Sequence, residues 1–162
     1  MIEWTDILRR SSPPGELRIA WRDYQAVLNL AILSAPFEVC GFLAGKGSHV
    51  CGVLPVPNIA SDPTTTFMMK GSDQFAAMRE IAARKWELLA IYHSHPSGER
   101  PDPSPADVEQ SQYPELLTVI ISPMVTSASA SMQAFTIVQG NVQAVPLIVV
   151  PNRQAACAQP CV

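Results

Sequence analysis

The sequence predicts a single α/β domain in which helices pack against a mixed β-sheet. The chain has 162 residues, of which 48% are hydrophobic, enough to bury one core without disulfide staples. Apolar runs of strand length alternate with two segments of helical periodicity, and two of these runs are joined by a tight turn. We expect one domain over residues 1–162, with a core at about residues 17–150 and a tail at residues 151–162.

The first half of the chain predicts a strand, a helix and a hairpin. After SSPPGE, the run LRIAW is typical of a strand, and RDYQAVLNLAILSA places Tyr24, Val27, Leu28 and Ile32 at helical spacing. Pro36 follows this helix and ends it. EVCGFLAGKG and HVCGVLPVPN predict two antiparallel strands joined by a Gly-Lys-Gly-Ser turn, and IASDPTTTFMMKG predicts a loop.

The second half predicts one more helix and the remaining strands. SDQFAAMREIAARKW places Phe75, Met78 and Ile81 on one helical face, with Ser72 or Asp73 as the N-cap. LLAIYHSH then predicts a strand that follows this helix. LLTVIIS, MQAFTIVQ and VQAVPLIVV are three further apolar runs, and we expect them to complete the sheet.

Charge and hydropathy argue against two classes of protein, those that bind nucleic acid and those that enter a membrane. The net charge is −3, and the 11 Lys and Arg residues are scattered, so no basic run offers a surface for phosphate backbones. No apolar segment approaches the roughly 18 residues of a membrane span. The start of the sequence, MIEWTDILRRSSPPGE, lacks the basic-then-apolar order of a signal peptide. We therefore expect a cytoplasmic protein that binds neither nucleic acid nor a membrane.

The four cysteines are compatible with a reducing compartment, because their spacing forms no paired CxxC zinc framework. Cys40 and Cys51 lie in strand-like runs and are interpreted as small core residues. Cys157 and Cys161 follow the last periodic segment. We expect this tail to fray, and a redox or metal role for the two residues is the less favoured alternative.

A histidine pair indicates a metal site. Two of the three histidines, His93 and His95, lie in AIYHSHPSGERPDPSPAD at the end of a predicted strand. Residues i and i+2 of a strand face the same side, so both imidazoles point to one place. A catalytic zinc takes three protein ligands and keeps one position for water. Asp107 is the candidate third ligand, because Ser104 as N-cap and Pro105 as first helical residue would turn Asp107 back toward the strand.

Hydrolysis at such a metal also needs a group that carries protons. Glu38 is the candidate, because it stands at the mouth of an otherwise apolar strand, where packing gives no reason for a carboxylate. An edge-of-strand carboxylate in solvent is the alternative. In the same way, a Ser-Pro-x-Asp tetrad alone is often only a helix start, and an HxH pair alone is often incidental.

The combination of these residues resembles a known family. Glu38, HSHP at residues 93–96, seven residues, Ser104, two residues and Asp107 resemble the E…H-S-H-P-x7-S-x-x-D signature of the JAMM (MPN+) metalloproteases. EVCGFLAG and LPVPNIA are similar to the family too, and the resemblance covers about residues 17–150. It implies a curved mixed sheet of the JAB/MPN, cytidine-deaminase-like fold. It also implies a Zn²⁺ cofactor bound by His93, His95 and Asp107, a zinc-bound water as nucleophile, Glu38 as general acid/base and Ser104 as oxyanion stabiliser.

The resemblance further implies the substrate. The family hydrolyses peptide or isopeptide bonds after the C-terminal Gly-Gly of ubiquitin-like proteins. Residues 56–71 and 123–131 are short beside the insertions of linkage-specific eukaryotic deubiquitinases, so the chain is more similar to compact prokaryotic members. Some of these release cysteine or another adduct from a sulfur-carrier protein. A homodimer is left open.

The segment TTTFMM is the candidate for holding an extended substrate tail. It is rich in β-forming residues and resembles a half-exposed sheet edge that is free to pair. Thr66, Phe67 and Met68 are the expected substrate-binding residues. The alternative is that Phe67 and Met68 fill the core between the hairpin and the second helix.

Three other functions remain open from the sequence. The RadC type of JAB domain has a similar HNHPSG stretch, but with one residue fewer before the serine, and a nucleic-acid role is poorly compatible with the acidic balance. A non-catalytic MPN− scaffold lacks the ligands, whereas all five site positions are filled here. A structural zinc module would need Cys40 or Cys51 as a fourth ligand.

Overall fold

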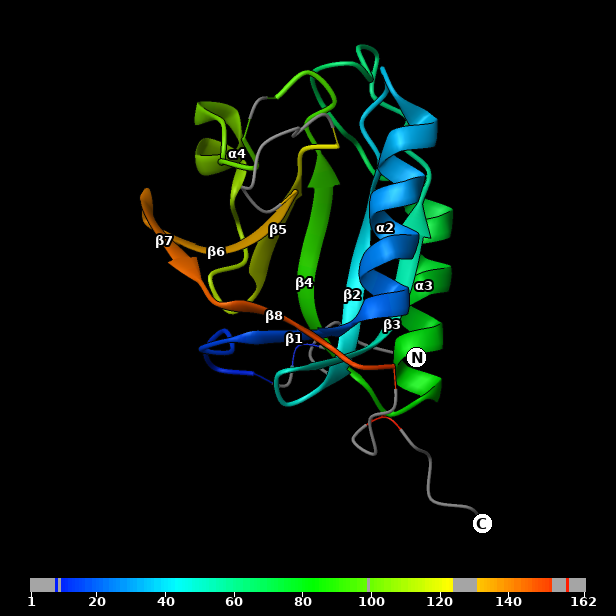
Figure 1. Ribbon diagram of the computed structural model, residues 1–162, viewed down its shortest axis with the longest axis vertical. Coiled ribbons are helices and arrows are strands. Elements are labelled where there is room, and N and C mark those ends of the chain that lie inside the picture. The colour runs from blue at the N-terminus through cyan, green and yellow to red at the C-terminus, as the bar shows by residue number, and fades with distance from the viewer. Residues whose placement is uncertain (1–7, 9, 99, 124–130, 153–156, 158–162) are drawn as a thin grey trace.

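The computed structural model describes residues 8, 10–98, 100–123, 131–152 and 157. An eight-stranded sheet organises this part of the chain (Figure 1). The elements in chain order are β1 (Leu17–Ala20), α2 (Trp21–Ser34), β2 (Cys40–Lys46), β3 (His49–Val56), α3 (Gly71–Ala83), β4 (Glu87–Ser94), α4 (Pro105–Gln110), β5 (Leu117–Ile121), β6 (Met132–Val138), β7 (Asn141–Val145) and β8 (Leu147–Val150).

The sheet has the strand order β7-β6-β5-β4-β2-β3-β1-β8. β4 pairs with β5 in parallel, β1 pairs in parallel with β3 and β8, and the other neighbours are antiparallel. The sheet curves strongly enough that β6 contacts β8 near the opposite edge. The predicted α/β domain with a mixed, curved sheet and flanking helices is therefore confirmed, while its boundaries stay a prediction.

The two long helices cover opposite faces of the sheet, and β2 shows why. Leu43 packs in the same buried cluster as Val27 of α2, whereas its neighbour Phe42 packs with Met78 and Ile81 of α3. Successive side chains of a strand point to opposite faces, so a strand covered on both sides is apolar along its length. In Figure 1, α2 lies in front of the sheet and α3 behind it.

The predicted face of the first helix is wrong at one position. In α2 the fully buried residues are Val27 and Ala31, while Ile32 is 48% exposed. A spacing of four residues keeps Ala31 on the side of Val27, whereas the next residue is rotated by about 100° toward solvent.

The predicted N-cap and one face residue of the second helix are also wrong. α3 begins at Gly71 with Lys70 as N-cap and no side-chain capping bond, so Ser72 and Asp73 lie inside the first turn. Its buried side includes Met78 and Ile81, but Phe75 is 54% exposed.

The last predicted run, VQAVPLIVV, forms two strands on opposite edges of the sheet. β7 pairs with β6 and β8 pairs with β1. Pro146 separates them, because proline has no backbone N–H to continue a ladder. Its carbonyl instead accepts a hydrogen bond from the Leu17 N–H at 2.8 Å. One apolar run thus connects the two edges of the curved sheet.

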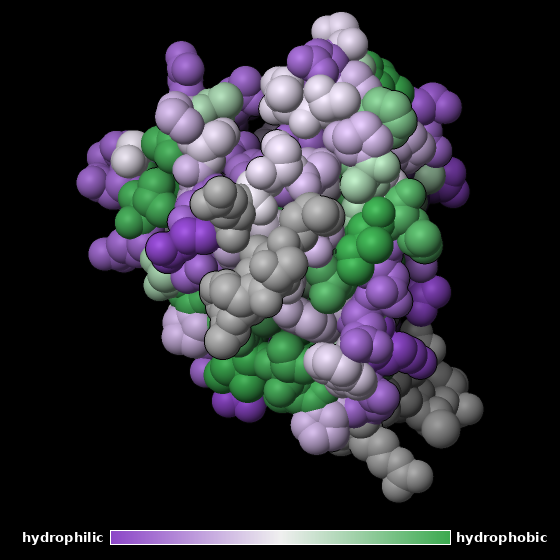
Figure 2. Space-filling model, turned by 45° about the horizontal axis from the view of Figure 1, so that its top comes forward, coloured by the Kyte–Doolittle hydropathy of each residue, from purple (hydrophilic) through white to green (hydrophobic). Residues whose placement is uncertain are grey.

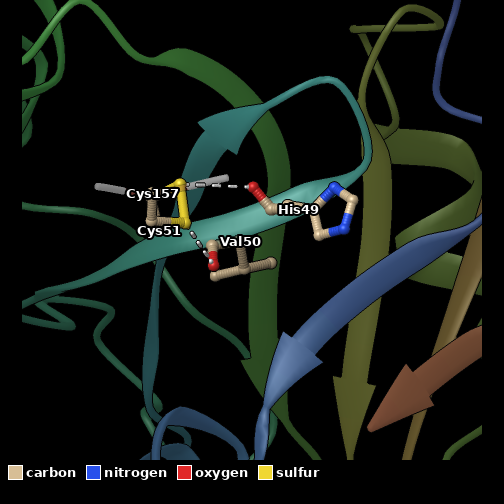
Figure 3. Close-up of a disulfide and its surroundings, with 4 residues drawn as sticks. All are labelled: His49, Val50, Cys51 and Cys157. Carbon is tan, nitrogen blue, oxygen red and sulfur yellow. Dashed lines mark hydrogen bonds between the residues drawn. A yellow bond between two sulfur atoms is a disulfide. The ribbon is translucent and has the colours of Figure 1, made fainter. Parts of the chain in front are cut away.

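Cys51 packs against the core, as interpreted, but it is not a free thiol, and the interpretation of Cys157 as part of a frayed tail is wrong. The two form a disulfide across 106 residues. Their sulfur atoms lie beside backbone carbonyls of β3, with Cys51 Sγ 3.6 Å from His49 O and Cys157 Sγ 3.5 Å from Val50 O (Figure 3). Such a distant pairing leaves no trace in cysteine spacing. Cys40 is free and buried, as predicted.

This disulfide removes one support for the predicted cytoplasmic location, because disulfides are rare in reducing compartments. The location therefore stays a prediction that depends on other features. Cys161 lies outside the described residues. Within the described ranges, no helix combines the length and apolarity that a membrane crossing requires.

Candidate metal centre

Strand β4 places two histidines at the end of the sheet. His93 lies within β4 and is 2% exposed, and His95 follows the last strand residue. The His95 N–H donates to the Ile121 carbonyl at 2.8 Å, which extends the pairing of β4 with β5 past the strand end. The two Nε2 atoms are 3.0 Å apart. Both rings thus face one point, as the period of a strand predicts.

The start of α4 supplies a carboxylate to the same point. Ser104 is the N-cap and Pro105 the first helical residue; the Asp107 N–H donates to Ser104 Oγ at 3.2 Å, and the Ser104 N–H donates to Asp107 Oδ2 at 2.7 Å. This reciprocal capping box fixes the carboxylate. Asp107 Oδ1 lies 3.0 Å from His93 Nε2, and Oδ2 lies 3.2 Å from His95 Nε2.

The structure brings the three predicted ligands together. Ligand atoms of His93, His95 and Asp107 lie within 4.8 Å of one another. Two imidazoles and a carboxylate form a donor set that zinc accepts with a fourth position free for water. Burial lowers the pKa of His93 and so favours the neutral imidazole that binds metals. The residues present therefore fit a zinc ion.

The carboxylate of this cluster is also in its metal-binding form. Burial acts to raise the pKa of Asp107, but hydrogen bonds with His93 and His95 outweigh it, and the pKa is lowered. Burial likewise acts to lower the pKa of His95, yet the hydrogen bond and charge of Asp107 raise it. The centre thus combines an ionised carboxylate with two imidazoles, of which the more buried one is neutral.

The surroundings of His93 isolate it from solvent. The ring of Phe67 stacks on the His93 ring with centroids 4.6 Å apart. The second ring nitrogen, His93 Nδ1, is buried and has no hydrogen-bond partner among the described residues. Metal-bound imidazoles usually donate this N–H to an outer partner. His93 is therefore held by packing and not by an outer hydrogen bond.

Glu38 lies next to this cluster, immediately before β2. The residue is only 6% exposed, so the alternative of an edge carboxylate in solvent is wrong. Burial raises the pKa of Glu38 to about 7; the charge of His95 opposes this shift, and the charges of Asp107 and Asp62 add to it. A carboxyl with this pKa can accept and return a proton near neutral pH.

Strand β4 also holds the backbone beside Glu38. Ser94, between the two histidines, is fully buried. Its Oγ accepts a hydrogen bond from the Val39 N–H at 2.9 Å, and its own N–H donates to the Val39 carbonyl at 3.0 Å. The sequence signal for this role is the position of Ser94 on the opposite side of the strand from the two histidines.

The hydroxyl of Ser104 is half-buried at the edge of the centre. Its oxygen accepts the capping bond from the Asp107 N–H. A hydroxyl can accept and donate at once, so this bond leaves the hydroxyl hydrogen available for another acceptor.

The predicted substrate segment forms a turn followed by one isolated β-bridge. The Thr66 N–H donates to the Asp62 carbonyl at 3.2 Å, so it serves the turn. The bridge joins Met69 to Asn58. Backbone hydrogen bonds lie on either side of this bridge. The N–H and C=O of Met69 therefore point away from Asn58, toward the side of the segment that pairs with no described strand. Met68 is 59% exposed, so it does not fill the core.

Two hollows flank the centre. A cleft of about 570 Å³ is lined by Phe67, Met69, His93 and Asp107, among others. A second hollow of about 720 Å³ lies beside Glu38, with several prolines and apolar residues of α2. Figure 2 shows that hydrophobic residues gather in separate patches on the face in view, with polar and intermediate residues between them.

Neither cysteine proposed as a fourth ligand belongs to the cluster that the described residues form. The Cys40 thiol donates to the Val56 carbonyl at 3.4 Å, and Cys51 forms the disulfide at the opposite end of β3. The described part of the chain thus supplies three ligands to this centre, which disfavours a closed structural zinc module.

Two known proteins have sequences similar to part of this chain. A protein named probable TtuB-protein conjugate cleaving protease, from Thermus thermophilus, is 35% identical over 79 residues, which are 49% of this chain and 52% of that protein. The desampylase of Pyrococcus furiosus is 34% identical over 85 residues, which are 52% of this chain and 59% of that protein. The matched regions thus span little more than half the length of these curated relatives.

Solved structures agree with the fold. A protein from Desulfitobacterium hafniense, solved in solution, gives a TM-score of 0.76 at 24% identity, covering 88% of this chain and 99% of that one. A JAB1/MPN domain protein from Archaeoglobus fulgidus gives a TM-score of 0.53 at 14% identity, covering 82% and 99%. The profile of the family described as prokaryotic homologues of the JAB domain matches residues 22–138, from α2 to β6. The resemblance to the JAMM signature is thereby confirmed, and the chain belongs to the compact prokaryotic JAB family.

Proposed function

We propose that the protein is a zinc-dependent peptidase that hydrolyses a peptide or isopeptide bond after the C-terminal Gly-Gly of a ubiquitin-like protein. The observation that carries this proposal is the partly buried His93–His95–Asp107 cluster with Glu38, a carboxyl of raised pKa, beside it. The names of the two similar proteins, which refer to conjugate cleavage, support the same class of reaction.

Each polar residue of the centre has a role in this proposal. His93, His95 and Asp107 would bind zinc, which lowers the pKa of a water and polarises a carbonyl when it is bound. Glu38 would take the proton from the attacking water and give it to the leaving amine, as its pKa of about 7 favours. Ser104 would donate its hydroxyl hydrogen to the developing oxyanion.

The segment around Phe67 would hold the substrate tail. An extended peptide pairs most simply with a free sheet edge, and the backbone of Phe67 makes no hydrogen bond within the described residues. We assign Phe67 and Met69 as the backbone partners of the tail, with Thr66 and Met68 beside them. Phe67 would also shield the reacting bond from water through its contact with His93.

We further propose that the preferred substrate is a linear adduct on the terminal glycine of a ubiquitin-like sulfur carrier in the cytoplasm. The segments at residues 56–71 and 123–131 are short beside the insertions with which linkage-specific deubiquitinases hold two ubiquitins. A lysine-linked diubiquitin should therefore be a poor substrate.

Cleavage assays test this function directly. A small ubiquitin-like protein ending in Gly-Gly is fused to a reporter peptide through its last glycine, and lysine-linked diubiquitins are the comparison. We expect turnover of the fusion, loss of activity with a chelator and recovery with Zn²⁺. Rapid, linkage-selective cleavage of diubiquitin without turnover of the fusion would contradict the proposed substrate. A zinc-loaded protein that cleaves neither would be a scaffold.

The pairing with Phe67 has its own test. Phe67→Pro removes both the ring and the amide donor, whereas Phe67→Ala removes only the ring. We expect KM for the fusion to be roughly 3–10-fold higher in Phe67→Pro than in Phe67→Ala, because this ratio corresponds to the loss of one hydrogen bond. The melting temperatures of the two variants should be similar. Equal KM values for the two variants would exclude the amide as a substrate contact.

A further inference from the structure

Asn58, in the loop after β3, uses every hydrogen-bonding atom of its side chain. Its Nδ2 donates to the carbonyls of Glu38 and Thr66, each at 3.0 Å. Its Oδ1 accepts from the N–H groups of Ala60 and Met68, also at 3.0 Å each. Because the nitrogen faces two acceptors and the oxygen faces two donors, the surroundings fix the orientation of the amide.

Glu38 needs such a partner because the sheet ladder stops beside it. The register of β2 on β3 pairs Cys40 with Val56, and continuing it places Glu38 opposite Asn58. The ladder ends before this pair. The Glu38 N–H instead donates to the Pro63 carbonyl at 2.7 Å, and its carbonyl accepts from Asn58. The side chain of Asn58 thus supplies the donor that the ladder lacks.

The other contacts of Asn58 reach the segment over the metal centre. Thr66 and Met68, which the amide holds from both sides, flank Phe67. Phe67 in turn stacks on His93. One half-buried side chain therefore connects the backbone of Glu38 to the stretch that covers a metal-ligating histidine.

We propose that Asn58 is a positioning residue for the hydrolysis, holding Glu38 and residues 66–68 in one fixed relation. This inference rests on the proposed function, in which Glu38 transfers protons and the segment holds substrate. A displacement of about 1 Å at a reacting group can lower a rate on the order of 10²-fold. Loss of the Glu38 contact therefore lowers kcat, and loss of the contacts with the segment raises KM.

Two variants at one position and a control in the same loop test the proposal. Asn58→Asp keeps the acceptor for Ala60 and Met68 but turns an oxygen toward the carbonyls of Glu38 and Thr66. Asn58→Ala removes all four bonds. The control Thr65→Ala removes a side-chain bond to Asp62 in the same loop, while the amide of Asn58 and the carboxylate of Asp62 stay in place.

Steady-state kinetics on the glycine fusion separate these cases. We expect both Asn58 variants to lose on the order of 10-fold or more in kcat and to raise KM several-fold, with zinc retained. Thr65→Ala should keep kcat within about twofold of wild type. A kcat of Asn58→Asp within about twofold of wild type would overturn the proposal, as would an equal loss of kcat in Thr65→Ala, because loop stability would then explain both.

Hydrogen exchange followed by NMR gives a second readout that needs no substrate. In zinc-loaded Asn58→Ala we expect the Glu38 amide to exchange at least about 10-fold faster than in wild type, while amides of β5 keep their protection. Unchanged exchange at Glu38 would overturn the positioning role whatever the activity. The two proposals can also fail separately. If the Glu38 amide exchanges faster in Asn58→Ala but the wild-type protein cleaves no ubiquitin-like fusion, the proposed function is contradicted and the positioning role of Asn58 is still supported.

Discussion

The two ends of the central strands are built differently. The four buried polar residues of the described chain, Glu38, His93, Ser94 and Ser122, all lie at the end where β4 and β5 finish or next to it. The opposite end is held by the disulfide of Cys51 and by apolar and ionic contacts. Buried polar groups lower stability unless they are fully paired. We infer that the first end is organised for chemistry and the second for stability.

Contacts at the second end support this division. The guanidinium of Arg84 lies 4.8 Å above the ring of the buried Trp86. A salt bridge of 2.8 Å joins Arg10 to Glu87 at the start of β4. Gly52 allows Trp86 to approach β3 so closely that a Cβ at this position would lie 2.3 Å from the ring. Substitutions here should change unfolding, whereas substitutions at the other end should change rates.

The largest expected effect is that of Glu38→Gln. We predict a loss of about 10²-fold or more in kcat with zinc retained, because the substitution removes the proton carrier and leaves the metal ligands intact. Steady-state kinetics and metal analysis of one preparation measure both quantities. A metal-free Glu38→Gln protein would make Glu38 a ligand and not a base.

Ser104→Ala should lower kcat by about 10²-fold through loss of an oxyanion donor. Because Ser104 is also the N-cap of α4, Ser104→Gly is the matched variant, since glycine is tolerated at an N-cap but has no hydroxyl. We expect Ser104→Gly to be as slow as Ser104→Ala. A rate near that of wild type in Ser104→Gly would assign the effect of Ser104→Ala to the structure of α4 and remove Ser104 from the chemistry.

At the other end, Cys51→Ala should destabilise the protein by about 2–5 kcal/mol, because the disulfide closes a long loop in the unfolded chain. Denaturant unfolding under oxidising conditions measures this change. The kcat should stay within about twofold of wild type, since Cys51 lies near the start of β3 and Glu38 lies beside the end of that strand. A large loss of kcat without loss of stability would show that the two ends are coupled.

The smallest effect concerns Glu38 and the pH dependence of stability in the metal-free protein. The folded pKa of about 7 exceeds the roughly 4.3 of an unfolded glutamate. The stabilising contribution of the protonated group is therefore complete below about pH 4.3 and is lost as pH rises to 7. Metal-free Glu38→Gln should match wild type near pH 4 and be about 1–2 kcal/mol more stable at pH 8.

Unfolding of chelator-treated proteins at several pH values measures this difference. The Glu38 charge also raises the pKa of His95, so the comparison measures the titration of Glu38 together with this coupling. A wild-type protein that is the more stable of the two at pH 8 would show that the Glu38 carboxylate is favourably paired and that its pKa is not raised.

Local signals explain which features the sequence could predict. The alternation of β4 places His93 and His95 together, and the capping box of Ser104 and Asp107 turns the carboxylate back toward them; both depend on residues two or three positions apart. These parts of the site were accessible to sequence analysis. The fold class was accessible for the same reason, since each strand and helix has its own periodicity.

Contacts between distant segments explain what the sequence could not predict. The bond of Ser94 to Val39 spans 55 residues, and the disulfide of Cys51 spans 106. The role of Asn58 depends on where the ladder between β2 and β3 ends, and on the shape of the turn that follows β3. No periodicity in the sequence predicts either feature. Pro146 does mark a break in the last run, but only the curvature of the sheet takes β8 to the opposite edge.

The most direct test of the account is the zinc content of the three ligand variants. Wild type, purified without chelator, should hold about one zinc per chain, and His93→Ala, His95→Ala and Asp107→Ala should each lose most of it while remaining folded by circular dichroism. His49→Ala, at the opposite end of β3, is the matched control and should keep the full amount. Full zinc binding by Asp107→Ala, or equal loss in His49→Ala, would contradict the assigned centre.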